Sequence, residues 1–226
     1  MRFSVSSPTL ANKVAQMIRN DILMGELKPN QKLVVADLKE KYNVGASPIR
    51  EALVELSWIK YVKLAPQKGC WVAPLCLIEL HELYESLRVV SGVLLRKAIE
   101  TGDESWELAV LTSFHKLSRI KQDAYSIDWI DWEEKHHSFH SALLEGSGSK
   151  LMFEFFNDVL CQVKRYRHFA AQSLSRDAAQ LCELEEHEQI MKLVLAKKPD
   201  EAIALLDKHL ETSLMQITSS VQAHAA

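Results

Sequence analysis

Apolar residues in the last two thirds of the chain recur at helical spacing between regularly placed breaks. Turn-forming residues such as Gly102-Asp103 and Pro199-Asp200 interrupt the pattern about every 20 residues. We expect helices over 75–101, 103–122, 126–146, 149–171, 176–198 and 200–223. Helices of this length joined by short loops form antiparallel bundles. The pattern therefore predicts an antiparallel six-helix bundle over residues 75–226.

The first 74 residues show shorter apolar stretches with more breaks between them. A helix is expected in "SPTLANKVAQMIRNDIL" and a short one in "VVADLKEKY", which ends at Asn43. In "VGASPIREALVELSWI" we expect Ser47 to be the N-cap and Pro48 the first helical residue, with an inward stripe of Ile49, Leu53 and Leu56. These segments predict three short helices.

The segment "KYVKLAPQKGCWVAPL" alternates apolar and polar residues around a turn at Pro66–Gly69 and predicts a β-hairpin. Three short helices followed by a hairpin are the elements of a winged helix-turn-helix, whose third helix enters the DNA major groove. The predicted fold is therefore mainly α, with a DNA-binding winged helix-turn-helix over 1–74 and an all-helical domain over 75–226.

Charge divides the chain in the same way. Residues 1–74 contain eleven Lys or Arg against six Asp or Glu, whereas residues 75–226 contain sixteen against twenty-four. A basic module joined to an acidic one favours a polyanion as the partner of the first. Ser47 and Arg50 would face DNA from the third helix, where arginine can grip a phosphate or a guanine, with Lys39 on the preceding helix and Lys63 and Lys68 on the hairpin. The alternative is that these are ordinary solvated surface charges.

The stretches "IRNDILMGELKPNQKL", "VGASPIREALVEL" and "KGCWVAP" resemble the N-terminal domain of the GntR family of bacterial transcription regulators. The resemblance implies that Arg50 is the family's recognition-helix arginine and Gly69 its wing glycine. Two positions depart from the family pattern. Ala46 stands where many members have arginine, and Asn30 replaces the usual loop glycine. The resemblance therefore does not predict the operator sequence.

All nine histidines lie in the acidic part of the chain, and "EEKHHSFHSAL" holds three of them within five positions. His136 and His140 are four residues apart and so stack on one helix face, shared with Trp132, Phe139 and Leu143. His187 and His209 also fall on apolar stripes of their helices. Such a set predicts a shared divalent metal, although four separately hydrogen-bonded core histidines are the alternative. His137 points about 100° away and is not expected to be a ligand.

The same half resembles the all-helical ligand-binding domain of the FadR-type branch of GntR regulators, through "KHHSFH", "EHEQI" and the "HL" at His209. The resemblance implies a divalent metal above which a small carboxylate binds. His136 stands where the family usually has Asp, which shifts the preference toward zinc, with nickel possible. Arg88 matches an arginine of the family, and Arg165 and Arg167 are further candidates for pairing with the ligand carboxylate. Arginines on amphipathic helices are otherwise solvated or ion-paired.

Together these features predict a dimeric DNA-binding regulator, acting as a repressor on an operator, that senses a small organic acid through a metal-containing domain. Alternatives are a metal-dependent hydrolase using the histidines and a purely structural metal. The hydrolase lacks an HExxH signature, and four imidazoles would close the metal site. No apolar run reaches the ~20 residues of a membrane span, and we expect no secretory signal. The four cysteines form no CxxC pair, so a cytoplasmic protein is expected.

Overall fold

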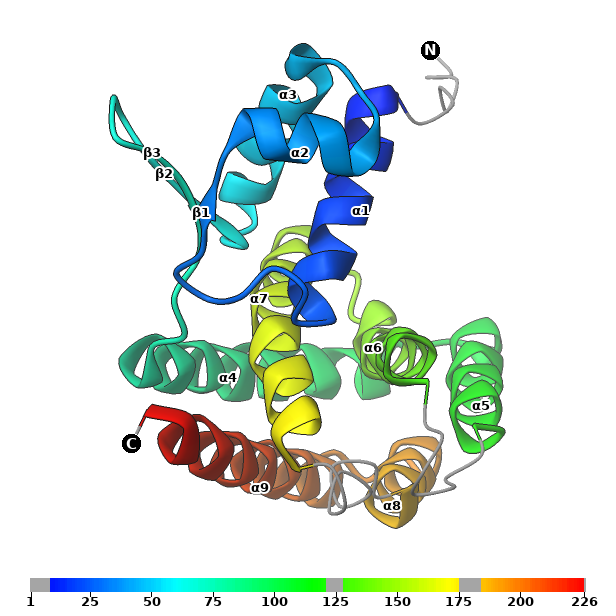
Figure 1. Ribbon diagram of the computed structural model, residues 1–226. Helices are drawn as coiled ribbons and strands as arrows, with labels where there is room; N and C mark the ends of the chain where they lie inside the picture. Colours follow the sequence, from blue (N-terminus) through cyan, green and yellow to red (C-terminus); the bar gives the residue numbers. More distant parts are fainter. Residues whose placement is uncertain (1–8, 121–127, 175–183, 226) are drawn as a thin grey trace. The chain divides into compact units, whose positions relative to one another are not determined.

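The computed structural model describes residues 9–120, 128–174 and 184–225 and is mainly helical, as predicted (Figure 1). The chain divides into two compact units, Met1–Leu75 and Cys76–Ala226. Among the described residues no helix is both long and apolar enough to cross a membrane.

The first unit contains the three predicted helices and the hairpin, together with one short strand that the sequence pattern does not predict. The elements are α1 (Leu10–Leu23), β1 (Lys32–Leu33), α2 (Val35–Tyr42), α3 (Ala46–Trp58), β2 (Val62–Ala65) and β3 (Gly69–Val72). The sheet has the order β1-β3-β2 and is antiparallel throughout. In β1, Lys32 pairs with Trp71 and Leu33 with Cys70. This is a winged helix-turn-helix.

The core of this unit lies between α1 and α3. Val14 and Ile18 of α1 and Ile49 of α3 are fully buried, and α1 begins with a capping box formed by Thr9 and Asn12. The prediction that Ser47 is the N-cap of α3 is wrong. Gly45 is the N-cap residue, and the helix begins at Ala46, so the Ser47 hydroxyl instead donates to Glu51 Oε1 at 3.1 Å.

Asn30 occupies a left-handed backbone conformation with φ of 65°. Glycine adopts this conformation at no steric cost, and asparagine is among the few other residues that tolerate it. The replacement of the family's loop glycine by Asn30 therefore preserves the turn between α1 and β1.

The second unit is a bundle of six helices in its described part, as predicted. They are α4 (Leu77–Thr101), α5 (Glu104–Ser118), α6 (Trp129–Glu145), α7 (Lys150–Leu174), α8 (Leu184–Leu195) and α9 (Pro199–Ala225). Helix α5 ends four residues earlier than expected. The predicted helical residues 121–122, 126–127 and 176–183 lie outside the described residues. Helix α9 runs beside α4 in the opposite direction (Figure 1).

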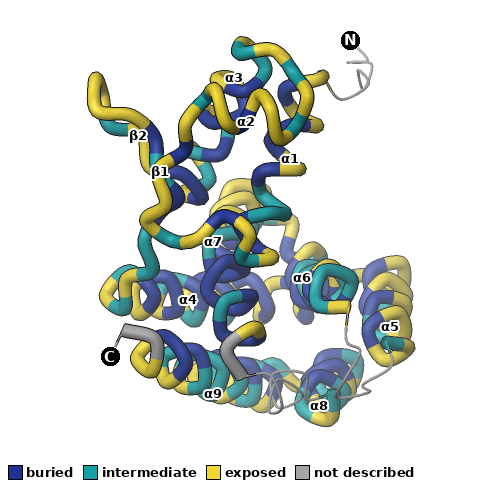
Figure 2. The backbone as a smooth tube through the Cα atoms, viewed as in Figure 1, coloured by how far each residue is buried: buried dark blue, intermediate teal, exposed yellow. Residues whose placement is uncertain are grey.

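Each long helix of the bundle turns one buried face inward and one exposed face outward (Figure 2). Trp132, Phe139, Tyr84 and Tyr166 are among the largest side chains in this interior, and none exceeds 2% exposure. Trp132 and Phe139 share the α6 face that carries His136 and His140. The apolar stripe of α6 therefore places two imidazoles in the centre of the bundle.

Candidate functional site

Four histidines from three helices meet in the bundle interior. They are His136 and His140 of α6, His187 of α8 and His209 of α9. Each offers one ring nitrogen, and the four nitrogens all lie within 4.8 Å of one another. His136, His140 and His187 are buried, and the His209 side chain is 11% exposed. We call these four residues the histidine cluster.

The geometry of the cluster suits a shared ion. His136 Nε2 and His140 Nε2 are 3.1 Å apart, because four residues make slightly more than one helical turn. Two nitrogens bound to one tetrahedral zinc at 2.0–2.1 Å would be about 3.3 Å apart. A single N–H···N hydrogen bond would also explain this pair, but it would not explain why His187 and His209 converge on the same point.

Burial sets the protonation state of His136 and His140. It lowers the pKa of His136 well below the usual value, and the neighbouring His140 lowers it further. Burial and the neighbouring His187 have the same effect on the pKa of His140. Both rings are therefore neutral near pH 7, which is the form that coordinates a metal. A set of four imidazole ligands fits zinc or nickel, and it does not fit magnesium or calcium.

A carboxylate lies behind His209, and the guanidinium of Arg167 lies behind His136. His209 Nδ1 donates to Glu186 Oε2 at 2.9 Å, and this hydrogen bond lowers the pKa of Glu186. Such a contact fixes the tautomer and leaves Nε2 free to bind a metal. On the opposite side, Arg167 Nη1 donates to Glu133 Oε1 at 2.7 Å and lies 3.3 Å from His136 Nδ1.

The ion pair between Arg167 and Glu133 is deeply buried, with 4% and 3% of the two side chains exposed. Burial alone would lower the pKa of Arg167, but the charge of Glu133, its hydrogen bond to Arg167 and the contact with Tyr84 together outweigh burial and keep that pKa above its usual value. Arg167 therefore remains charged beside the histidine cluster.

A small pocket adjoins the cluster and is lined mainly by leucines. Its polar lining residues are His140, His209, Arg167, Ser91 and Ser213. Such a lining combines one cation and two hydroxyl groups with apolar walls. The cavity volume is about 10 Å³, which is room for about one water molecule, so an anion with some apolar surface would match this lining only if the pocket widened.

The three arginines predicted to bind a carboxylate have different surroundings. Arg167 lines the pocket. Arg88 instead forms a two-pronged ion pair with Asp207, at 2.6 and 2.7 Å, and Arg165 pairs with Glu79 at 3.3 Å. Neither is among the residues that line the pocket beside the histidines. Only Arg167 is therefore placed with the cluster.

Sequence reasoning did not assign Glu133, Ser91 or Ser213 to this site. The position of Glu133 could have been found, because it lies three residues before His136 and so shares its helix face. The two serines are single small polar residues on α4 and α9, and nothing in the local pattern distinguishes them. His137 is partly buried and is not a member of the cluster.

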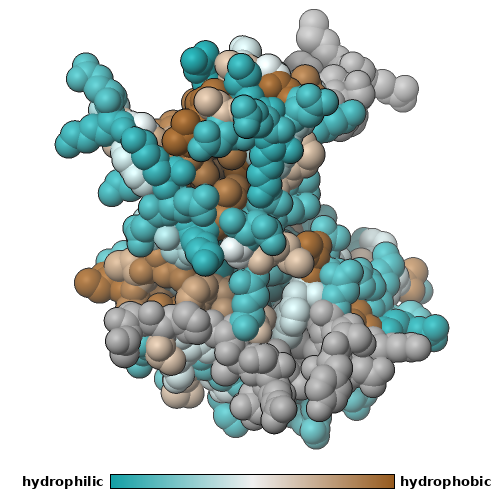
Figure 3. Space-filling view, viewed as in Figure 1, coloured by the Kyte–Doolittle hydropathy of each residue, from teal (hydrophilic) through white to brown (hydrophobic). Residues whose placement is uncertain are grey.

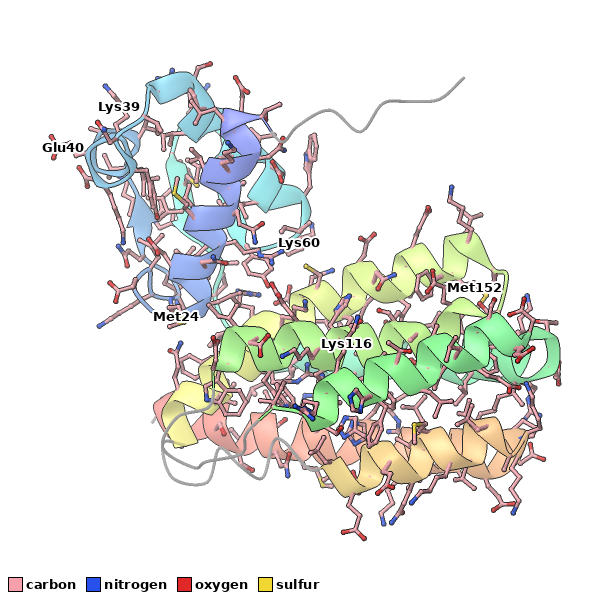
Figure 4. The ribbon with its side chains drawn as sticks, turned by 90° about the vertical axis from the view of Figure 1, so that its right-hand side faces the viewer. Met24, Lys39, Glu40, Lys60, Lys116 and Met152 are labelled. Atoms are coloured by element: carbon pink, nitrogen blue, oxygen red, sulfur yellow. The ribbon has the colours of Figure 1, made fainter. Side chains whose placement is uncertain are left out.

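The six residues predicted to contact DNA are all exposed in the first unit: Lys39, Ser47, Arg50, Lys63, Lys68 and Gly69. Lys39 lies on the outer surface of α2 (Figure 4). Within the described part of the chain, no hydrogen bond or ion pair engages the side chains of Arg50, Lys63 or Lys68. The hairpin that carries Lys63 and Lys68 presents a hydrophilic surface (Figure 3).

Gly69 closes the turn of this hairpin. Its φ of +125° is a conformation that other residues rarely adopt, and Lys68 N donates to Ala65 O at 3.1 Å across the turn. The wing glycine therefore shapes the hairpin through its backbone, and the charged side chains beside it remain available to a partner.

Comparisons with known proteins agree with this two-part organisation. Residues 10–72 match the model of the gntR family of bacterial regulatory proteins, and residues 82–212 match the model of the FCD domain. The uncharacterized HTH-type transcriptional regulator BphR of Paraburkholderia xenovorans is 30% identical over 91% of this chain and 84% of its own length. The HTH-type transcriptional repressor GlaR of Escherichia coli is 29% identical over 87% of this chain and 90% of its own.

The fold has a close structural counterpart in Escherichia coli McbR/YncC, with a TM-score of 0.75 and 16% identity over 95% of this chain and 100% of that one. The relatives and both matched families are regulators of transcription, and none supports the hydrolase alternative. This chain therefore belongs to the GntR family of bacterial transcription regulators, in the FadR-type branch that carries an FCD domain.

Proposed function

We propose that this regulator is a dimeric, metal-containing repressor that releases its operator when a small carboxylate binds beside the histidine cluster. The observation that carries the proposal is the convergence of four imidazoles next to a pocket lined by the buried Arg167. His136, His140, His187 and His209 would hold zinc, or alternatively nickel. When bound, this ion would supply positive charge for an anionic ligand.

The pocket favours a particular kind of ligand. Arg167 already shares its charge with Glu133, so the second attraction for an anion would come from the ion held by the histidines. Ser91 and Ser213 can each hydrogen-bond a ligand oxygen, and the leucine walls exclude water. A compact mono- or dicarboxylic acid would match the chemistry of this lining, and its entry would require the cavity of about 10 Å³ to widen.

The effector is expected to stabilise the protein only when the metal is present. Ligand at 100 times its dissociation constant adds about 2.7 kcal/mol to the free energy of unfolding. Mono- and dicarboxylates would be screened by thermal shift on zinc-loaded protein, with chelated protein as the control. A matched variant is Arg88→Ala, which should respond like the wild type because Arg88 lies outside the pocket. If zinc stabilises and no carboxylate adds to it, the metal is structural instead.

For DNA binding, we propose that Arg50 contacts bases or phosphates, with support from Lys39, Ser47, Lys63, Lys68 and the turn at Gly69. Arg50 lies near the start of α3 and is exposed, at the edge of the buried stripe of Ile49 and Leu53. One winged module reads one half-site, so a specific operator would be a short inverted repeat bound by two copies.

Replacing Arg50 by alanine should weaken specific DNA binding by roughly 1–3 kcal/mol, since a bidentate contact to a base would be lost. An electrophoretic shift assay with the DNA upstream of the protein's own gene would measure it. Arg119→Ala is a matched control, because it removes the same charge from an exposed position at the end of α5. Equal affinity of the Arg50 and Arg119 variants would refute the recognition-helix assignment.

A second copy of the chain would dock on an apolar groove between α4 and α7. Val89, Leu151 and Phe155 line this groove and are 67%, 81% and 50% exposed, and Met152, labelled in Figure 4, lies beside them. Soluble proteins rarely expose such a group without a partner. An inverted repeat requires two-fold symmetry, and a two-fold interface uses the same patch on both copies.

A further inference from the structure

Helix α4 begins without a cap of its own. Its N-cap residue is Cys76, whose side chain makes no capping hydrogen bond. Tyr166 of α7 holds this N-cap residue in place, since the Cys76 backbone N–H donates to its hydroxyl at 3.3 Å. Tyr166 is fully buried, and its hydroxyl in turn donates to Glu79 in the first turn of α4. The start of α4 is therefore held by a side chain 90 residues away in sequence.

Arg165 strengthens the same connection. Its Nη2 lies 3.3 Å from Glu79 Oε2, the oxygen that also accepts from Tyr166. Burial and the hydrogen bond to Glu79 raise the pKa of Tyr166, so the hydroxyl keeps its proton and remains a donor. Two consecutive residues of α7 thus fix the position of one carboxylate at the beginning of α4.

The next residue of α7 faces the histidine cluster. Arg167 donates to Glu133 at 2.7 Å, and its Nη1 lies 3.3 Å from His136 Nδ1. Successive residues of a helix differ by about 100° in direction, so residues 165–167 reach two different neighbours at one level of the bundle. Because the backbone between them is a regular helix, a shift of Arg167 also moves Tyr166.

The location of the α4 start makes this connection significant. The boundary between the two compact units lies between Leu75 and Cys76, so the first turn of α4 follows directly after the DNA-binding unit. We infer that residues 165–167 of α7 transmit occupancy of the histidine cluster to the start of α4, with Tyr166 as the positioning residue. This inference rests on the proposed function, because it requires both a bound metal and a DNA response.

The test compares DNA affinity with and without zinc, using zinc alone as the probe and the DNA upstream of the protein's own gene. In the wild type, saturating zinc should change the apparent DNA dissociation constant by about five-fold or more, the lower end of typical coupling between sites. In Tyr166→Phe the change should fall below about two-fold, since the ring still fills its space and only the hydroxyl is lost. Zinc stoichiometry should be the same in both proteins.

Two further variants make the outcome specific. Glu79→Gln removes the charge that both Tyr166 and Arg165 engage, and it should reduce the zinc response in the same direction. Ser113→Ala removes a buried hydroxyl of α5 that bonds only within its own helix, and it should keep the full response. The inference would be overturned if zinc changed the DNA affinity of Tyr166→Phe as much as that of the wild type. It would also be overturned if the wild type bound both zinc and DNA but zinc left its DNA affinity unchanged. Failure of the wild type to bind zinc would instead show that the proposed function is wrong.

Discussion

Replacing both His140 and His187 by alanine is expected to remove the bound metal and to lower the melting temperature of the protein. The change leaves only His136 and His209, on different helices, and two imidazoles do not fill a tetrahedral site. Since the metal binds the folded chain, its loss removes about 4 kcal/mol from the free energy of unfolding when free metal stands at 1,000 times its dissociation constant. Calorimetric melting of zinc-loaded protein would measure the effect.

The control for this variant lies on the same helix. His137→Ala removes an imidazole next to His136 that is not part of the cluster, and it should retain the metal and most of the stability. Melting curves recorded with and without a chelator separate the stability that the metal contributes from the stability that side-chain packing contributes. If the double variant loses the same stability with and without a chelator, the histidines are ordinary core residues.

Replacing Glu133 by alanine is expected to destabilise the protein by about 3–5 kcal/mol, because it leaves the buried charge of Arg167 without its partner. The effect should persist in chelated protein, which separates it from metal loss. Urea unfolding would measure it. Asp131→Ala on the same helix is the matched control, since its ion pair with Lys135 is largely solvated and should contribute only about 0.3–0.5 kcal/mol. A cost below about 1 kcal/mol for Glu133→Ala would contradict the assignment of a buried charge pair.

Helical periodicity was sufficient to predict the bundle and the inward direction of the histidines. On α6 the stripe of Trp132, His136, Phe139, His140 and Leu143 lies on one face at a spacing that admits only that arrangement. The strand β1 could not be found in the same way, because two residues show no periodicity and β1 exists only through its pairing with β3. The N-cap of α3 was misplaced because Ser47 favours that role by type, whereas the extended backbone of Gly45 determines it.

The partners of the arginines were beyond sequence reasoning. Arg88 pairs with Asp207, which is 119 residues away, and Arg165 with Glu79, which is 86 residues away. Several carboxylates can lie within reach of a long arginine side chain, and the packing of the helices determines which of them is nearest. For the same reason the sequence does not predict that Ser91 and Ser213 line one pocket, because that pocket forms only where α4 and α9 pack together.

Whether the histidine cluster holds a metal is tested most directly by the metal content of protein purified without a histidine tag. Elemental analysis of the wild type should find about one equivalent of zinc or nickel per chain, because four imidazoles that meet at one point complete one tetrahedral site. Less than half an equivalent after exposure to these metals would contradict the claim.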